Sequence, residues 1–196
     1  LSNTLMMYVS SPAWSYWRGY AYDSYNGQAW VQSNPNIEEI TTEDGGGFFR
    51  LKEDWGDDLF VQTFYIQQPM PNILWTGGDP SLIIFPVDSI GLDVTNGIRV
   101  GESLQAGMLY TVVSNRVEFE PDALRRDSGD YPDDIRETYL QLPDTISQRT
   151  RDLAYSLTDN QPTTYDKVLA VRDYLLTTFP YDYFPPPQAP DTDAVD

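Results

Sequence analysis

Short apolar and aromatic runs alternate with turn residues over the first 120 residues, a pattern typical of strands joined by hairpins. Two Asn-Gly pairs, Asn26-Gly27 and Asn96-Gly97, each separate two such runs and predict tight turns, because both residue types accept a positive φ. The other strand candidates, rich in β-branched and aromatic residues, are residues 6–10, 59–67, 81–87 and 108–114. The segment 34–47 combines Pro35 with a charged Gly-rich run and is predicted to be an exposed, mobile loop.

After Pro121 the apolar positions take the helical spacing of three and four. Helices are predicted over residues 132–140, 144–157 and 164–178. The last of these begins with Thr163 and Asp166 spaced as a capping box and stops before Pro180.

Strands followed by helices predict an α+β chain. We expect an antiparallel β-sandwich or barrel-like domain over residues 1–120 and a small helical subdomain over residues 121–184. Residues 185–196, rich in Pro and Asp, are expected to form a linker or disordered tail.

The amino-acid composition limits the reactions and the partners that the chain could have. The chain of 196 residues has no Cys and no His, which excludes thiol, imidazole and thiolate-metal catalysis within it. Thirty acidic residues face twelve basic ones, and the resulting charge of -18 repels nucleic acid and anionic lipid alike. No apolar run reaches the length of a membrane span, and because the chain begins with Leu1 we expect it to be part of a longer protein.

The remaining catalytic alternatives have weak signals. A Ser-Lys enzyme would need Lys52 or Lys167 as its base, and both lysines lie in polar surroundings that indicate contact with water. Paired carboxylates for glycoside hydrolysis cannot be selected among thirty acids. Acidic clusters at residues 54–58 and 127–134 could bind calcium, but turn formation and helix N-terminal charge explain them as well.

The most distinctive string runs from Tyr16 to Trp30 and predicts a strand, an Asn-Gly turn and a return strand. Trp17 and Trp30 are expected to anchor the core, and Arg18 to pair with an acid. This string resembles the extracytoplasmic region of bacterial membrane-anchored transglutaminase-like proteins. The resemblance returns at residues 140–143, 165–167 and 179–182. Its signature residues are Tyr16, Trp17, Arg18, Gly19, Tyr22, Asp23, Tyr25, Gly27, Trp30, Tyr165, Asp166 and Lys167.

The resemblance implies a non-catalytic, extracytoplasmic portion that supports or flanks a Cys-His-Asp acyl-transfer core. That core would follow Asp196 in the same polypeptide and be the partner of this chain, and attachment to the cell membrane would come from segments outside it. No catalytic, cofactor or metal residue is then expected here.

The alternative is a stand-alone β-sandwich module that binds polysaccharide or protein, with an aromatic face formed by Trp14, Tyr16, Tyr20, Tyr22 and Tyr25.

Overall fold

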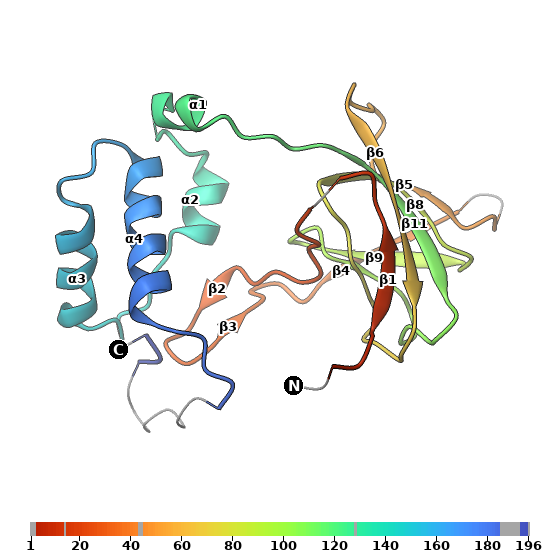
Figure 1. The fold of residues 1–196 in the computed structure, drawn as a ribbon, viewed down its shortest axis with the longest axis horizontal. Coiled ribbons are helices and arrows are strands. Elements are labelled where there is room, and N and C mark those ends of the chain that lie inside the picture. The colour runs from red at the N-terminus through yellow and green to blue at the C-terminus, as the bar shows by residue number, and fades with distance from the viewer. Residues whose placement is uncertain (1–2, 14, 43–44, 128, 185–192, 196) are drawn as a thin grey trace. The chain divides into compact units, whose positions relative to one another are not determined.

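The computed structural model describes residues 3–13, 15–42, 45–127, 129–184 and 193–195. Within these ranges, eleven strands form three antiparallel sheets and four helices follow them (Figure 1). Contacts divide the described chain into a β-rich unit, residues 3–22 and 34–118, and a helical unit, residues 23–33 and 119–195. The early segment 23–33 therefore belongs with the late helices.

The larger sheet of the β-rich unit has five strands in the order β1-β6-β11-β8-β5. Their bounds are Met7–Ser10 for β1, Leu59–Ile66 for β6, Leu109–Asn115 for β11, Asp79–Ile84 for β8 and Phe48–Arg50 for β5. Four of these, β1, β6, β8 and β11, confirm strands predicted from the sequence.

The second sheet has four strands in the order β4-β9-β10-β7. Their bounds are Ile37–Thr41, Ser89–Asp93, Ile98–Arg99 and Ile73–Leu74. The turn at Asn96-Gly97 joins β9 to β10, with Asn96 at φ 60°, and this prediction is confirmed. The prediction of a loop over 34–47 is wrong for β4, which pairs with β9 along its whole length.

One apolar cluster joins the two sheets. Along β6 buried and exposed residues alternate, and the inward-facing Phe64 stacks on Tyr110 of β11 with ring centroids 4.7 Å apart. Leu74, Ile90 and Ile98 reach the same cluster from the second sheet. Because both sheets contribute to one core, the α+β class with an antiparallel sandwich is confirmed.

The helical unit contains α1 (Pro121–Arg126), α2 (Asp133–Tyr139), α3 (Gln148–Thr158), α4 (Thr164–Thr178) and the hairpin of β2 (Ser24–Tyr25) with β3 (Trp30–Val31). Helix α4 has the predicted bounds, and its capping box is confirmed by the bond from the Asp166 N–H to Thr163 Oγ1. Helix α3 starts four residues later than predicted, because Ser147 caps it by accepting from the Thr150 N–H. Helix α1 was not predicted.

Replacing the fully buried Phe64 with Ala should lower the free energy of unfolding of the β-rich unit by about 3–5 kcal/mol, because the substitution leaves a cavity against Tyr110. Urea denaturation followed by fluorescence measures this loss. The control Val61→Ala, on the exposed face of the same strand, should change the free energy by less than about 1 kcal/mol. Equal losses for the two variants would contradict this account of the core.

Candidate functional site

The β2–β3 hairpin is held by its own turn. The Asn26 N–H donates to the Ala29 carbonyl over 3.2 Å, and Asn26 Oδ1 accepts from the N–H groups of Gln28 and Ala29. Gly27 has φ +91°, a conformation that suits glycine. The predicted Asn26-Gly27 hairpin is thus confirmed, although each of its strands has only two residues.

Residues from the end of the chain dock on this hairpin. The Tyr25 hydroxyl donates to Asp193 Oδ1 over 2.6 Å, and Thr145 Oγ1 donates to Asp193 Oδ2 over 2.7 Å. The Ala194 N–H donates to the Gly27 carbonyl over 2.8 Å. A Cβ at Gly27 would lie 2.5 Å from Thr145 Oγ1, so this approach requires glycine. We call these residues, Tyr25, Gly27, Thr145, Asp193 and Ala194, the Asp193 anchor.

Hydrogen bonds set the ionisation of the anchor. The pKa of Asp193 lies below its ordinary value, first because the Tyr25 hydroxyl donates to it, and also because the Val195 N–H and Thr145 donate. The pKa of Tyr25 is raised by burial and then by its bond to the carboxylate. The anchor therefore pairs an ionised Asp193 with a neutral Tyr25 at neutral pH.

Asp23 closes the base of the hairpin. This buried carboxylate accepts from the Ser33 N–H over 2.8 Å and from the Ser33 hydroxyl. The main-chain carbonyl of Asp23 accepts from Gln141 Nε2 over 3.3 Å, and this bond links the hairpin to the segment before α3. The hairpin is thus tied to two parts of the helical unit, near Gln141 and at Asp193.

The signature residues of α4 form a second small network. Arg125 of α1 contacts Asp166 over 3.0 Å and lies over the Tyr165 ring, 5.3 Å from its centroid. Bonds from Thr163 and then Arg125 lower the pKa of Asp166. Lys167 is exposed. This network joins α1 to the start of α4.

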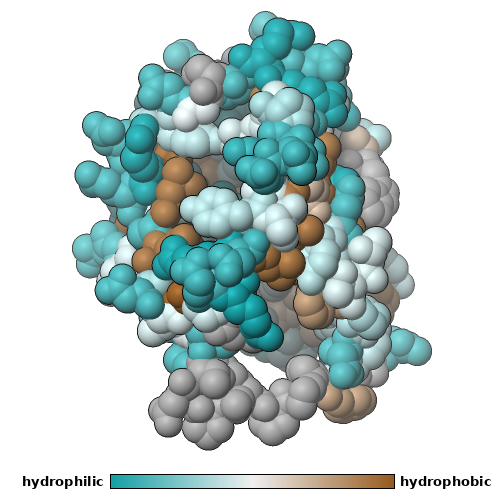
Figure 2. All heavy atoms as spheres, turned by 90° about the vertical axis from the view of Figure 1, so that its left-hand side faces the viewer, coloured by the Kyte–Doolittle hydropathy of each residue, from teal (hydrophilic) through white to brown (hydrophobic). Residues whose placement is uncertain are grey.

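The helices expose many apolar side chains. None of the four described helices contains a buried residue. Figure 2 shows one face of this unit, where apolar side chains lie open between polar ones. The exposed large apolar residues of the unit's helices and of the segments that follow them are Ile135, Tyr139, Leu140, Leu142, Leu153, Tyr155, Val168, Leu175, Leu176, Phe179, Tyr181, Tyr183, Phe184 and Val195.

The first half of the signature lies in the β-rich unit. Arg18 pairs through its main chain with Thr76, and its guanidinium donates to the Thr95 carbonyl rather than to the acid expected from the sequence. Gly19 lies against the Trp75 indole, which a Cβ would approach to 2.9 Å. Both residues therefore fix the path of this segment along the sandwich.

The aromatic signature residues are less buried than the sequence suggested. Trp17 touches Phe64 edge-on but is 39% exposed, and Trp30 packs against Tyr25 with the rings tilted by 39° but is 57% exposed. The expectation that Trp17 and Trp30 anchor one core is wrong, because Trp30 belongs to the helical unit. Tyr16 and Tyr22 are exposed.

The structure also locates the residues of the alternative hypotheses. In the proposed aromatic face, Tyr25 is buried and Trp14 lies outside the described residues. Lys52 forms an ion pair with Asp79. In the described part of the chain, no three His, Cys, Asp or Glu side chains gather as a metal site, and no helix has the length and apolar character to cross a membrane.

Sequence reasoning missed the Asp193 anchor. A linker or disordered tail was expected over residues 185–196, but residues 193–195 are docked on the hairpin. Residues 185–192 and 196 lie outside the described residues. The sequence identifies Gly27 as a hairpin glycine. Nothing in the sequence around Thr145 indicates that this residue contacts the hairpin.

Comparison with solved structures defines the fold. The chain aligns over 96% of its length with the periplasmic domain of TgpA from Pseudomonas aeruginosa, with a TM-score of 0.61 and 17% identity. A second structure of that domain, bound to ethylmercury, gives a TM-score of 0.59 and 16% identity. The chain spans 61% of the first TgpA chain.

Among curated proteins, the chain is similar to the uncharacterized protein YebA of Bacillus subtilis (strain 168), with 39% identity over 71 residues. That match covers 34% of this chain and 9% of YebA. No protein-family model matches the chain.

Replacing Tyr25 with Phe should loosen the anchor, because Asp193 loses its shortest donor. Hydrogen exchange measured by NMR should show several-fold less protection of the Ala194 amide. The control Tyr155→Phe, at an exposed position of α3, should leave that amide unchanged. Unchanged protection in the Tyr25 variant would contradict the anchor.

Acid should release the anchor as well. Because the folded pKa of Asp193 is lowered, its stabilisation is fully present above the ordinary value of 3.8 and is lost as the pH falls through the lower folded pKa. The protection factor of the Ala194 amide should therefore fall only below about pH 4. The variant Asp193→Asn should show no such decline. A transition centred well above pH 4 would contradict this assignment.

Proposed function

We propose that this chain is a non-catalytic, extracytoplasmic portion of a transglutaminase-like membrane protein. Three observations support the proposal: the signature residues around Asn26-Gly27 and at the start of α4, the lack of Cys and His, and the fold shared with the periplasmic domain of TgpA, a transglutaminase-like membrane protein. In this proposal the chain supports a Cys-His-Asp acyl-transfer core of the same polypeptide.

The exposed apolar face of α4 is the observation that carries the proposal. Val168, Leu175 and Phe179 are spaced by seven and four residues, so they lie on one face of α4 and its C-terminal end. All three side chains are exposed. Since helices normally bury such a stripe, this face suits a docking partner.

The acyl-transfer core is the partner we assign to that face. Support comes from the share of the TgpA domain that the alignment leaves uncovered, since this chain spans 61% of it. In such a core a thiolate activated by imidazole would perform the chemistry. The Asp193 anchor would fix the path of the chain after α4, so that the core meets the helices in one orientation.

Leu175→Asp in the polypeptide encoded by the complete gene tests this function. The charge would be buried against the core, so thiol-dependent acyl transfer should fall at least tenfold. In the isolated chain, where Leu175 is already exposed, the free energy of unfolding should change by less than about 0.5 kcal/mol. The matched control Thr177→Asp, placed about 200° around α4, should keep the activity.

Two results would count against the proposed function. One is a complete gene that encodes no Gly-x-Cys followed by His and Asp. The other is full activity of the Leu175→Asp polypeptide, which would show that the α4 face has a different partner.

A further inference from the structure

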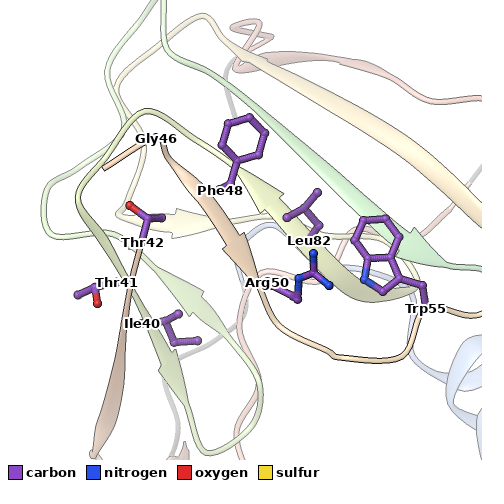
Figure 3. A pocket seen from close by; sticks show the side chains of 8 residues that line it. All are labelled: Ile40, Thr41, Thr42, Gly46, Phe48, Arg50, Trp55 and Leu82. Atoms are coloured by element: carbon purple, nitrogen blue, oxygen red, sulfur yellow. The ribbon is translucent and has the colours of Figure 1, made fainter. Parts of the chain in front are cut away.

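A cavity of about 560 Å³ lies in the β-rich unit beside β5, at one edge of the five-stranded sheet. Figure 3 shows the side chains that line it, with β5 on one side and β4, an edge strand of the other sheet, opposite. Its volume falls within the range of ligand sites. The lining residues are Ile40, Thr41, Thr42, Gly46, Phe48, Arg50, Trp55 and Leu82.

Within the described residues, no strand pairs with the outer edge of β5. The Gly47 carbonyl accepts from the Phe85 N–H, and the Leu51 N–H donates to the Ser81 carbonyl, so these residues turn toward β8. Residues of an antiparallel strand alternate, and the N–H and C=O groups of Phe48 and Arg50 therefore turn away from β8. Since β5 is an edge strand, these groups can receive a further strand.

The side chains of the same two residues face outward. Along β5 only Phe49 is buried, while Phe48 is 60% exposed and Arg50 is exposed. Leu82, the register partner of Arg50 on β8, lies on the same face of the sheet. A strand added to β5 would place its own side chains beside Phe48 and Arg50, at a spacing of two residues.

Arg50 supplies a local positive charge. Its guanidinium carbon lies 5.6 Å from the Trp55 ring centroid. In the described part of the chain Arg50 forms no ion pair, whereas Arg99, Arg116 and Arg125 each pair with an aspartate. A carboxylate directly across a strand pair from Arg50 would complement this charge.

The cavity also contains the hydroxyl group of Thr42. Thr42 Oγ1 is buried and makes no hydrogen bond within the described residues. A buried hydroxyl is normally satisfied, so this atom suits a polar ligand group on the β4 side of the cavity.

We propose that an extended peptide adds to the free edge of β5, with an acidic side chain opposite Arg50 and an apolar side chain opposite Phe48. In antiparallel pairing the peptide reads acidic-x-apolar. Two main-chain residues would form ladder bonds to Phe48 and Arg50, which gives affinity, and the two side chains give selectivity.

Two synthetic peptides test this selectivity at physiological salt, where the chain's overall negative field is screened beyond about 8 Å. The probe is Ser-Thr-Val-Glu-Val-Phe-Thr-Ser, and its control has Lys in place of Glu. The overall charge of -18 favours the Lys peptide, so a preference for the Glu peptide reports Arg50 itself. We expect the Glu peptide to bind roughly fivefold more tightly and to protect the Phe48 and Arg50 amides from hydrogen exchange.

Variants of the protein and of the peptide separate the two contributions. Arg50→Glu should reverse the preference toward the Lys peptide, and Arg126→Glu, an exposed arginine of α1, should leave the preference unchanged. N-methylation of the Glu and Phe residues of the probe removes its ladder donors and should abolish binding.

Several results would overturn the proposal: equal or reversed preference in the native chain, unaffected binding of the N-methylated probe, or no new protection at Phe48 and Arg50 at millimolar peptide. Binding of chitohexaose in this cavity, with no binding of the peptide, would assign the site to a glycan and overturn it too.

Discussion

An ionised carboxylate can be buried only where hydrogen bonds replace its water, and this constraint organises the loops of the chain. Among the described residues the buried carboxylates are Asp23, Asp93 and Asp193. Asp93 accepts from the N–H groups of Thr95 and Gly97 and so closes the turn between β9 and β10. Asp23 and Asp193 hold the β2–β3 hairpin. Each carboxylate holds a short segment in place by accepting several hydrogen bonds.

The two units depend on different forces. The β-rich unit has a core in which fully buried residues from both sheets meet, so the burial of apolar surface stabilises this unit. The described helices bury no residue completely and are connected by polar contacts such as Arg125 with Asp166. Exposed ion pairs contribute little. The helical unit therefore has less buried apolar surface to stabilise it than the β-rich unit.

Local signals in the sequence were sufficient for much of the fold. The capping box and Pro180 defined α4, and the Asn-Gly pairs defined both hairpins, because these features act over a few residues. Strand β4 was missed because charged Glu38 and Glu39 interrupt its apolar pattern. The Asp193 anchor could not be predicted from local sequence patterns, because it joins residues 168 positions apart. The exposure of the α4 face depends on packing, which helical spacing alone does not report.

The hairpin at residues 23–33 has a consequence for the order of folding. It lies between the two segments of the β-rich unit, residues 3–22 and 34–118, but belongs with helices that follow that unit. During synthesis the sandwich of residues 3–22 and 34–118 can therefore fold first, while Tyr25 meets its partner Asp193 only after 168 more residues have been made. The two units are therefore interleaved in the sequence, and the helical unit can complete its contacts to the hairpin only after Asp193 has left the ribosome.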